Sequence, residues 1–298
     1  MAVTDRFAAR VLQVVLGRLA RPPASLTGDH ADTPAPQAIT VPTPAGPVMV
    51  HIHRPAAART PDWLLPPVYV NFHGGGFITR HPEYDDHLCR ALVRLTGCVV
   101  VNVDYDVAPQ RPFPTAPRQA YAVARWVATN GGTQGWDGKR MAVGGQSAGG
   151  NLAAGICLQA RDDGTPPPVL QILNYPPLDL AADPAGKQAR TARPLINPRI
   201  AKLFNNAYTP DPATRTDPLA SPLLAADLRG LPPALVITAE YDLLRDEGDR
   251  YAARLAEAGV PVTHQVMQGA DHAFTHVEPA GPVYEALSLM TTALTDAW

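Results

Sequence analysis

The sequence predicts a single α/β domain built around a mostly parallel β-sheet. Short runs rich in β-branched residues alternate with helical stretches along most of the 298 residues, which is the pattern of α/β domains. The central residues of these runs are almost all apolar, as in parallel strands that helices cover on both faces. The expected strands are 48–53, 68–72, 98–104, 141–144, 169–174, 235–238 and 262–267, and the expected helices are 84–95, 116–129, 151–161, 247–258 and 283–296.

The segment before these strands predicts little regular structure beyond one helix. Residues 6–20 predict an amphipathic helix, because their apolar side chains recur at helical spacing opposite arginines. Gln13 and a Gly-Arg pair interrupt the apolar run, which is therefore too short for a secretion signal. Residues 22–46 are rich in proline, threonine and alanine and predict an irregular connection. The runs 48–53 and 68–72 then follow closely, as in a hairpin-like start.

A second segment interrupts the alternation of strands and helices. Residues 178–230 separate two expected strands by far more than an ordinary crossover requires. They contain one expected short helix at 200–207 among proline-rich loops. We interpret them as an insertion that forms a cap over the site together with about residues 1–45. Neither segment has enough apolar residues for a core of its own, so we expect residues 1–298 to form one domain.

Composition and charge exclude several classes of protein. The chain has 25 basic and 27 acidic residues, a net charge of −2, so no electrostatic attraction to nucleic acid or to an anionic membrane is expected. No apolar run approaches the length that spans a membrane. The cysteines Cys89, Cys98 and Cys157 are widely spaced, which argues against a disulfide framework and a zinc site. We expect them to be small buried side chains in a reducing cytoplasm.

The strongest local motif is G-x-S-x-G, centred on Ser147. It follows the expected strand MAVG directly and precedes the expected helix NLAAGICLQA. A nucleophile exposed on a tight turn between strand and helix has a strained backbone, and side chains two residues away would collide with their surroundings. Gly145 and Gly149 meet that requirement. Because strand and helix both flank the motif, a nucleophile is favoured over an ordinary glycine-rich turn.

A second motif, HGGGF at residues 73–77, follows the expected strand 68–72. A run of glycines lets the backbone approach a ligand and direct several N–H groups at one atom. The segment matches neither the phosphate-binding P-loop pattern nor the dinucleotide-binding pattern. A loop that stabilises an oxyanion is the expected partner of a nucleophilic serine on a tight turn.

An acid and a base are expected downstream of Ser147, in that order. Asp242 follows the expected strand 235–238, and His272 follows the last expected strand. Loops at the carboxyl ends of parallel strands share one edge of the sheet, so the three side chains can converge there. The base would take the serine proton, and the carboxylate would orient the imidazole.

Other residues compete for these roles. His276 is the one serious alternative base, and Asp246 and Glu247 are alternative acids, although carboxylates there also suit the start of the following helix. A metal cluster is conceivable in the acidic turn, but no second ligand group matches it, so we interpret the turn as a solvated helix start. Its residues are His81, Asp85, Asp86 and His87.

Several motifs together resemble the hormone-sensitive-lipase-like esterases of bacteria, a family with the α/β-hydrolase fold. These are HGGGF, GQSAGG, YDLLRDEG and GADHAF, joined by DYDVAPQRPFP at 104–114 and TDPLASPLLAADLRGLPPALV at 216–236. The resemblance covers roughly residues 65–280. It implies an eight-stranded, mostly parallel sheet flanked by helices with a helical cap, and hydrolysis of short- to medium-chain esters without cofactor or metal.

The resemblance also implies a role for each matching residue. The implied roles are the nucleophile Ser147, the acid Asp242, the base His272, the oxyanion N–H groups of Gly75, Gly76 and Ala148, and the loop-supporting residues His73 and Gly74. Substrate size would be set by pocket residues on the glycine loop, the acidic turn and the cap, for which the candidates are Phe77, Tyr84, Phe204, Asn205 and Tyr208.

This chain departs from the family pattern at four positions. Gln146 stands where the family usually has Asp, Asp106 and Gln110 replace the usual Arg and Glu, and Leu243 replaces a Pro. We hypothesise that a buried charge network behind the serine turn has been rearranged. None of the four is an implied catalytic or oxyanion residue, so activity is expected to survive.

The sequence therefore predicts a serine carboxylesterase that acts on a small-molecule ester through an acyl-enzyme. Two alternatives remain open. One is a non-catalytic ligand-binding or receptor protein on the same fold, since fold alone does not determine function. The other keeps the catalytic groups but acts as a natural-product deacetylase, lactonase or related enzyme. A homodimer is expected only by family analogy, and the expected location is the cytoplasm.

Overall fold

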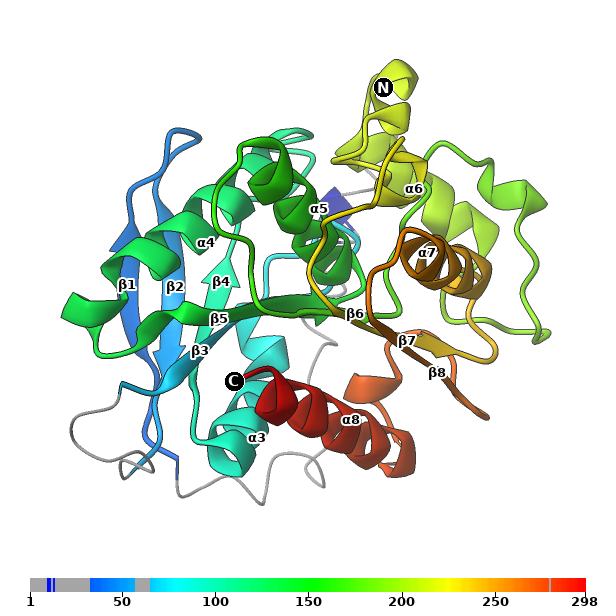
Figure 1. The fold of residues 1–298 in the computed structure, drawn as a ribbon. Coiled ribbons are helices and arrows are strands. Elements are labelled where there is room, and N and C mark those ends of the chain that lie inside the picture. The colour runs from blue at the N-terminus through cyan, green and yellow to red at the C-terminus, as the bar shows by residue number, and fades with distance from the viewer. Residues whose placement is uncertain (1–9, 12, 14–32, 57–64, 279) are drawn as a thin grey trace.

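The computed structural model describes residues 10, 11, 13, 33–56, 65–278 and 280–298. Its centre is one eight-stranded sheet in the order β1-β2-β4-β3-β5-β6-β7-β8 (Figure 1). β2 pairs antiparallel with β1 and β4, and the remaining neighbours are parallel. The strands are β1 (Gln37–Val41), β2 (Val48–His53), β3 (Pro67–Phe72), β4 (Val99–Asp104), β5 (Asp137–Gln146), β6 (Gln171–Asn174), β7 (Ala234–Ala239) and β8 (Val262–Met267). The predicted α/β fold with a mostly parallel, eight-stranded sheet is confirmed.

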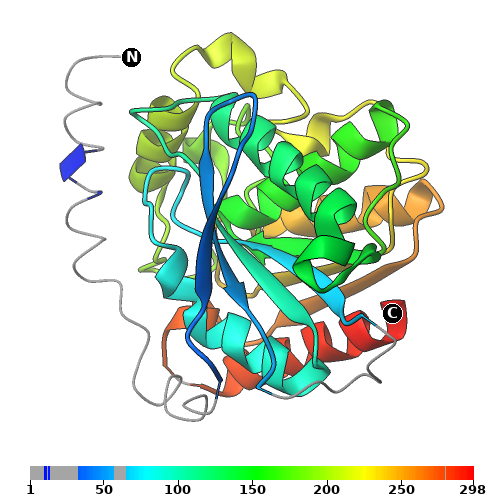
Figure 2. The ribbon, with the colours of Figure 1, turned by 90° about the vertical axis from the view of Figure 1, so that its left-hand side faces the viewer.

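Helices cover both faces of this sheet. α4, α5 and α7 lie on one face, and α3 and α8 lie on the other (Figure 1). The rotated view in Figure 2 shows the sheet twisting between these two layers. The helices are α3 (Asp86–Thr96), α4 (Thr115–Gln134), α5 (Ala148–Asp162), α6 (Pro198–Tyr208), α7 (Arg245–Glu257) and α8 (Gly281–Ala297). Each predicted helix between residues 84 and 296 corresponds to one of them.

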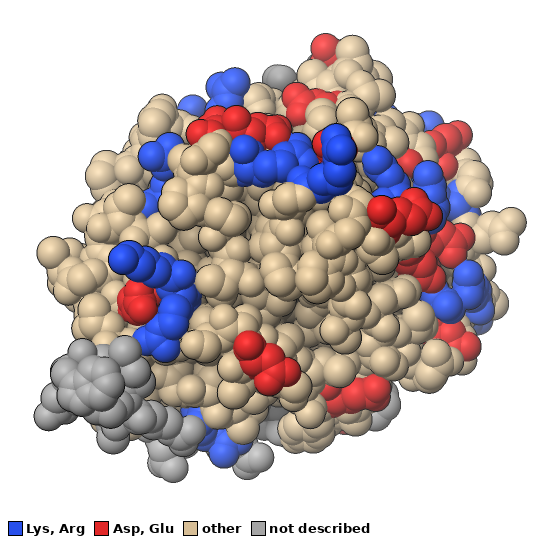
Figure 3. All heavy atoms as spheres, in the orientation of Figure 1, with Lys and Arg blue, Asp and Glu red and all other residues tan. Residues whose placement is uncertain are grey.

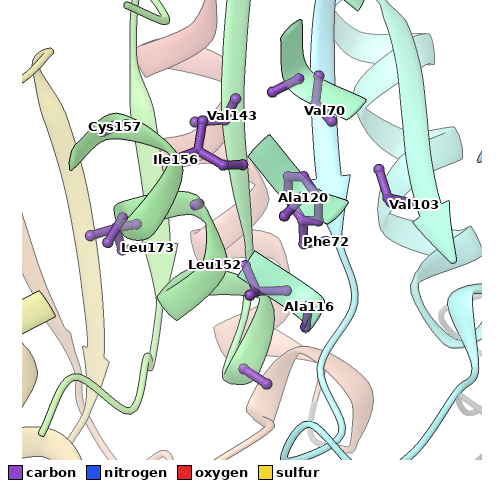
Figure 4. Close-up of a cluster of buried hydrophobic side chains, with 14 of the residues drawn as sticks. Val70, Phe72, Val103, Ala116, Ala120, Val143, Leu152, Ile156, Cys157 and Leu173 are labelled. Carbon is purple, nitrogen blue, oxygen red and sulfur yellow. The ribbon is translucent and has the colours of Figure 1, made fainter. Parts of the chain in front are cut away.

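The largest core cluster lies between the sheet and the α4–α5 layer. Leu152 and Ile156 of α5 pack with Phe72 of β3 and Val143 of β5 (Figure 4). All four are at most 1% exposed. Burying side chains of this size stabilises the fold by roughly 1.5–3 kcal/mol each. This packing holds the start of α5, and therefore Ser147, rigidly against the carboxyl ends of the central strands.

The N-terminal predictions need correction. Residues 22–46 do not form a wholly irregular connection, because 37–41 form β1 at the edge of the sheet. The hairpin-like pairing of the first two predicted strands is also wrong, since β2 pairs with β1 and β4, and β3 lies between β4 and β5. β1 is a short run between prolines, and only its ladder with β2 identifies it as a strand. The predicted helix 6–20 falls outside the described residues, apart from positions 10, 11 and 13, which are helical.

The long connection between β6 and β7 contains mostly loop, as predicted. The expected helix at 200–207 is α6, and Pro198 occupies its first turn. The side chain of Asn197 caps α6 by accepting hydrogen bonds from the N–H groups of Arg199 and Ile200. The other regular elements of this connection are three short 3₁₀ turns, Pro184–Gly186, Pro212–Thr216 and Pro222–Leu224.

The described surface agrees with the balanced charge of the sequence. On the face drawn in Figure 3, basic and acidic side chains are interspersed rather than gathered into a patch of one sign. Within the described residues, no helix is long and apolar enough to cross a membrane.

Candidate active site

Ser147 stands at the junction of β5 and α5. Its backbone angles, φ 52° and ψ −116°, are unusual for a residue other than glycine. A Cβ atom on Gly145 or Gly149 would overlap the carbonyl oxygen of Phe72. Both glycines of the motif are therefore required by the close approach of β3. The N-terminus of α5 follows Ser147 directly and favours negative charge next to it.

Ser147, His272 and Asp242 form one hydrogen-bonded row. His272 Nε2 lies 2.8 Å from Ser147 Oγ, and His272 Nδ1 lies 2.7 Å from Asp242 Oδ2. The exposed fractions are 8% for Ser147, 5% for His272 and 1% for Asp242. The carboxylate must accept the Nδ1 proton, which leaves Nε2 free to accept the serine proton. This is the geometry of a catalytic triad.

The loops that carry Asp242 and His272 leave the carboxyl ends of β7 and β8. Asp242 Oδ1 accepts a hydrogen bond from the Leu244 N–H at 2.9 Å, so both of its oxygens have partners. The Asp271 carboxylate accepts hydrogen bonds from the N–H groups of His272 and Leu195, each at 2.7 Å. This carboxylate joins the histidine loop to the long connection between β6 and β7.

The competing acids and base have other partners. His276 pairs with Asp85, its Nε2 lying 2.8 Å from Asp85 Oδ1. Asp246 is exposed and pairs with Arg190. Glu247 lies in the first turn of α7, as predicted.

One interpretation of the acidic turn is wrong. Asp85 is fully buried and His87 is only 3% exposed, so these two residues are not part of a solvated helix start. Asp85 lies in the 3₁₀ turn Pro82–Asp85, which precedes α3. Burial, together with the nearby His276, lowers the pKa of His87 to about 4. The sequence reasoning missed this burial because charged residues at a helix start usually face water. Within the described chain, no group of three or more His, Cys, Asp or Glu side chains could hold a metal ion.

The glycine loop lies directly beside the serine turn. A Cβ atom on Gly74 would come 3.3 Å from the carbonyl oxygen of Gln146. Gly75 and Gly76 have positive φ angles of 119° and 59°, a region that glycine adopts without strain.

His73 and Tyr105 hold the start of this loop. Their rings stack at 4.3 Å, and the Tyr105 hydroxyl donates to the His73 carbonyl oxygen at 2.8 Å. Burial lowers the pKa of His73, so its imidazole is neutral and donates through Nδ1 to the Gly74 carbonyl oxygen at 2.7 Å.

The expected pocket residues lie in two places, one around the glycine loop and α6 and the other beside His276. Phe77 and Tyr208 stack face to face at 3.8 Å, and both are nearly fully buried. Phe204, one turn before Tyr208 on α6, touches Gly76, where a Cβ atom would come 2.5 Å from its ring. Asn205 donates to the Leu180 carbonyl oxygen at 3.3 Å. The half-buried ring of Tyr84 stacks on His276 at 4.3 Å.

The hypothesis of one rearranged charge network behind the serine turn is not supported. Gln146 is buried, and neither polar atom of its side chain has a partner in the described structure. Asp106 is 21% exposed, and its carboxylate pairs with Arg80 and accepts a hydrogen bond from the buried Gln119. Gln110 is exposed and bonds to Gln13. These substituted positions therefore occupy different environments in the fold, and they do not form one network.

Tyr175 is a site residue that the sequence reasoning missed. It directly follows β6, its φ angle is +38°, and its ring lies edge-on to the His272 ring at 5.0 Å. Its place after a strand, at the same sheet edge as Ser147 and Asp242, was the available signal.

Comparison with known proteins identifies the family. A family model described as alpha/beta hydrolase fold matches residues 69–276. Esterase LipI of Mycobacterium tuberculosis is 40% identical over 220 residues, which cover 74% of this chain and 68% of LipI. The chain spans about two thirds of the length of the curated relatives it matches.

Solved structures match over nearly the whole chain. An esterase of Pyrobaculum calidifontis has a TM-score of 0.84 and 35% identity, covering 97% of this chain and 92% of its own. EstE1, a carboxylesterase cloned from a metagenomic library, has a TM-score of 0.86 and 33% identity, covering 100% of this chain and 99% of its own. The chain therefore belongs to the hormone-sensitive-lipase-like family of serine carboxylesterases within the α/β-hydrolase superfamily.

Proposed function

We propose that Ser147 is the nucleophile, His272 the general base and acid, and Asp242 the carboxylate that orients His272. The observation that carries this proposal is the hydrogen-bonded row from Ser147 Oγ through His272 to Asp242, with 2.8 Å and 2.7 Å separations. These are distances at which proton transfer between the groups is efficient.

The reaction follows from this geometry. Ser147 Oγ bonds to the ester carbonyl carbon while its proton moves to His272 Nε2, and the carbonyl π pair moves onto oxygen. The tetrahedral intermediate collapses, the alcohol leaves with the proton from His272, and an acyl-serine remains. Water then attacks the acyl-serine while His272 takes its proton, and His272 gives this proton to Ser147 Oγ as the carboxylic acid leaves.

We propose that the N–H groups of Gly75, Gly76 and Ala148 stabilise the oxyanion. Ala148 begins α5, so its N–H belongs to the helix end that favours negative charge. Gly74 leaves room for the serine turn, and the stacking of His73 on Tyr105 supports the loop.

We propose that about residues 1–45 and 178–230 form a cap over this site. Phe204 from the second segment lies against Gly76, and Leu195 donates to Asp271. From the first segment, Gln13 donates to the carbonyl oxygens of Ile78 and Ala108 at 2.6 Å and 2.8 Å. The strand β1 within that range belongs to the sheet rather than to the cap.

Short- to medium-chain esters are the proposed substrates. The half-buried rings of Phe204 and Tyr84 are the surfaces that an ester would contact, whereas the stacked pair Phe77 and Tyr208 is buried. A ring directly against Gly76 limits the volume beside the proposed oxyanion position.

The test is hydrolysis of p-nitrophenyl acetate, butyrate, octanoate and palmitate by wild type and by Ser147→Ala. Turnover is expected for the shorter esters, and none above background for the variant. A folded wild type that hydrolyses none of these esters would refute the proposal and favour a ligand-binding protein on the same fold or an enzyme for a natural-product ester.

A homodimer and a cytoplasmic location are two further proposals. The dimer rests on family analogy, and light scattering after size-exclusion chromatography tests it. The location fits the state of Cys89, Cys98 and Cys157, which are all buried free thiols. Fractionation of cells that produce the protein tests the location.

A further inference from the structure

A second buried Asp–His pair lies beside the triad. His276 Nε2 is 2.8 Å from Asp85 Oδ1, and the two residues are 3% and 0% exposed. His276 ends the short turn Phe274–His276, which follows the loop of His272. The proposed ester hydrolysis uses neither residue of this pair.

The pair continues as a chain of hydrogen bonds. His276 Nδ1 lies 2.8 Å from Thr275 Oγ1, and Thr275 Oγ1 is bonded to the Tyr175 hydroxyl. Burial raises the pKa of Tyr175 well above its usual value, so its hydroxyl keeps its proton. The Asp85 carboxylate can only accept, so His276 Nε2 donates to it, and we assign His276 Nδ1 as the acceptor from Thr275. Tyr175 therefore donates to Thr275, and every bond in the chain has one donor and one acceptor.

The far end of this chain is anchored in the centre of the sheet. Asp85 Oδ2 accepts from Asn71 Nδ2 at 2.8 Å, and Asn71 Nδ2 also donates to Asn102 Oδ1 at 2.9 Å. Asn102 donates in turn to the Pro82 carbonyl oxygen at 2.7 Å. Asn71 belongs to β3 and Asn102 to β4, and both are buried. The chain of bonds thus starts on two rigid central strands.

The near end reaches the proposed catalytic base. The Tyr175 ring meets the His272 ring edge-on, with centroids 5.0 Å apart and an interplanar angle of 66°. The same ring also packs edge-on against Phe274 at 5.2 Å. Its positive φ of 38° is a strained conformation for a tyrosine. The surrounding contacts hold that conformation in place.

We infer that Asp85, His276, Thr275 and Tyr175 form a positioning relay that fixes the imidazole plane of His272. Tyr175 is the positioning residue, and the other three hold its hydroxyl. Thr275 is 0% exposed and Tyr175 is 2% exposed, so the relay is closed to substrate and is not a second active site. His87 steadies it by placing Nε2 2.8 Å from the Thr275 carbonyl oxygen. The inference rests on the proposed role of His272.

The test uses two esters that differ in their need for the acid role of His272. The leaving group of an alkyl butyrate is an alkoxide that must receive a proton, whereas the p-nitrophenolate of the aryl ester leaves without one. Tyr175→Phe removes the bond between Tyr175 and Thr275, whereas Thr275→Val removes that bond and the bond to His276, and both variants keep the side-chain shape. Both variants should lower kcat/KM for ethyl butyrate by about a hundredfold, as expected for a displaced catalytic group. The loss for p-nitrophenyl butyrate should be at least fivefold smaller.

Two matched variants serve as controls. Thr275→Ser keeps the Oγ atom and should restore activity to within about threefold of wild type on both esters, since the hydrogen-bonding group is retained. Tyr251→Phe removes a fully buried tyrosine hydroxyl that has no partner among the described residues, and it should leave both activities unchanged. Thermal unfolding of every variant separates misplacement of His272 from loss of the fold.

The outcomes distinguish the relay from the proposed reaction. Folded Tyr175→Phe or Thr275→Val with unchanged activity, or with equal losses on both esters, would overturn the relay and leave the triad proposal standing. If one of these variants fails to fold, the activities of the other variant test the relay. A folded wild type without activity on either ester would overturn the proposed function and the relay's role together.

Discussion

Two Asp–His pairs lie side by side in this molecule, and only one of them is joined to a serine. Asp242–His272 and Asp85–His276 have nearly equal N···O distances, 2.7 Å and 2.8 Å, and all four side chains are at most 5% exposed. The first pair ends on Ser147 at a strained turn. The second ends on Thr275, a fully buried hydroxyl that is bonded in turn to Tyr175.

A buried Asp–His pair therefore does not by itself make a catalytic site. Such a pair orients an imidazole in either place, but chemistry also requires a nucleophile that a substrate can reach and N–H groups placed for the oxyanion. Ser147 has both the strained turn and the neighbouring glycine loop. The second pair has neither, and its hydrogen bonds end within the core.

The largest expected effect separates the two histidines. His272→Asn should lower kcat by roughly 10⁵-fold, because the proton acceptor for Ser147 is lost. His276→Asn should lower it by only about tenfold to a hundredfold, because His272 would remain but would be held less accurately. Steady-state kinetics with p-nitrophenyl butyrate measures both. Equal losses in the two folded variants would contradict the distinction between the pairs.

The two aspartates should separate activity from stability. Asp242→Asn should lower kcat by roughly 10⁴-fold, because the amide favours the wrong tautomer of His272. Asp85→Asn should instead lower the free energy of unfolding by about 3 kcal/mol, since one amide hydrogen then faces a donor, either Asn71 or His276. Urea unfolding measures the second effect. The idea fails if Asp85→Asn is as stable as wild type.

The third prediction concerns how acid lowers the stability of the protein through His87, which lies next to the second pair. Burial lowers the pKa of His87 from 6.5 to about 4, so the unfolded chain binds the extra proton first as pH falls. This contribution to stability is complete above pH 6.5 and is lost between pH 6.5 and 4, by roughly 3 kcal/mol in all. His87→Gln keeps a donor for the Thr275 carbonyl and removes the titration. The free energy of unfolding, measured at several pH values between 7.5 and 4, should therefore fall less steeply with pH in the variant. An equal fall in wild type and variant would contradict the assignment of this acid sensitivity to His87.

The smallest effect is expected at Gln146, which precedes Ser147. Its buried amide has no partner among the described residues, in contrast to the fully paired groups of both Asp–His pairs. Gln146→Met has a similar volume and should raise the free energy of unfolding by about 1 kcal/mol, because no polar group is then desolvated. Activity should stay within about twofold of wild type. A destabilised variant would mean that the amide is paired in solution.

The parts of the fold and site that the sequence could predict are local. The strands β3, β4 and β7 are buried runs of mostly apolar residues, and the motif around Ser147 carries both glycines that its turn requires. β1 was missed because five residues between prolines contain no signal of their own. The burial of Asp85 was missed for a related reason, since its partners Asn71 and His276 lie far from it along the chain.

Local patterns were enough to predict the order of the strands and helices along the chain, apart from β1, together with the tight turn at Ser147 and the loops that carry Asp242 and His272. These follow from apolar periodicity, glycine and the chain order of motifs, which act over a few residues. Packing in three dimensions was needed to show which histidine reaches Ser147, that Tyr175 lies against that histidine, and that Phe204 covers Gly76. The His272–Ser147 bond joins residues 125 positions apart, and the His276–Asp85 bond joins residues 191 positions apart. Such long-range contacts depend on how the helical layers pack on the sheet, so no short stretch of sequence predicts them.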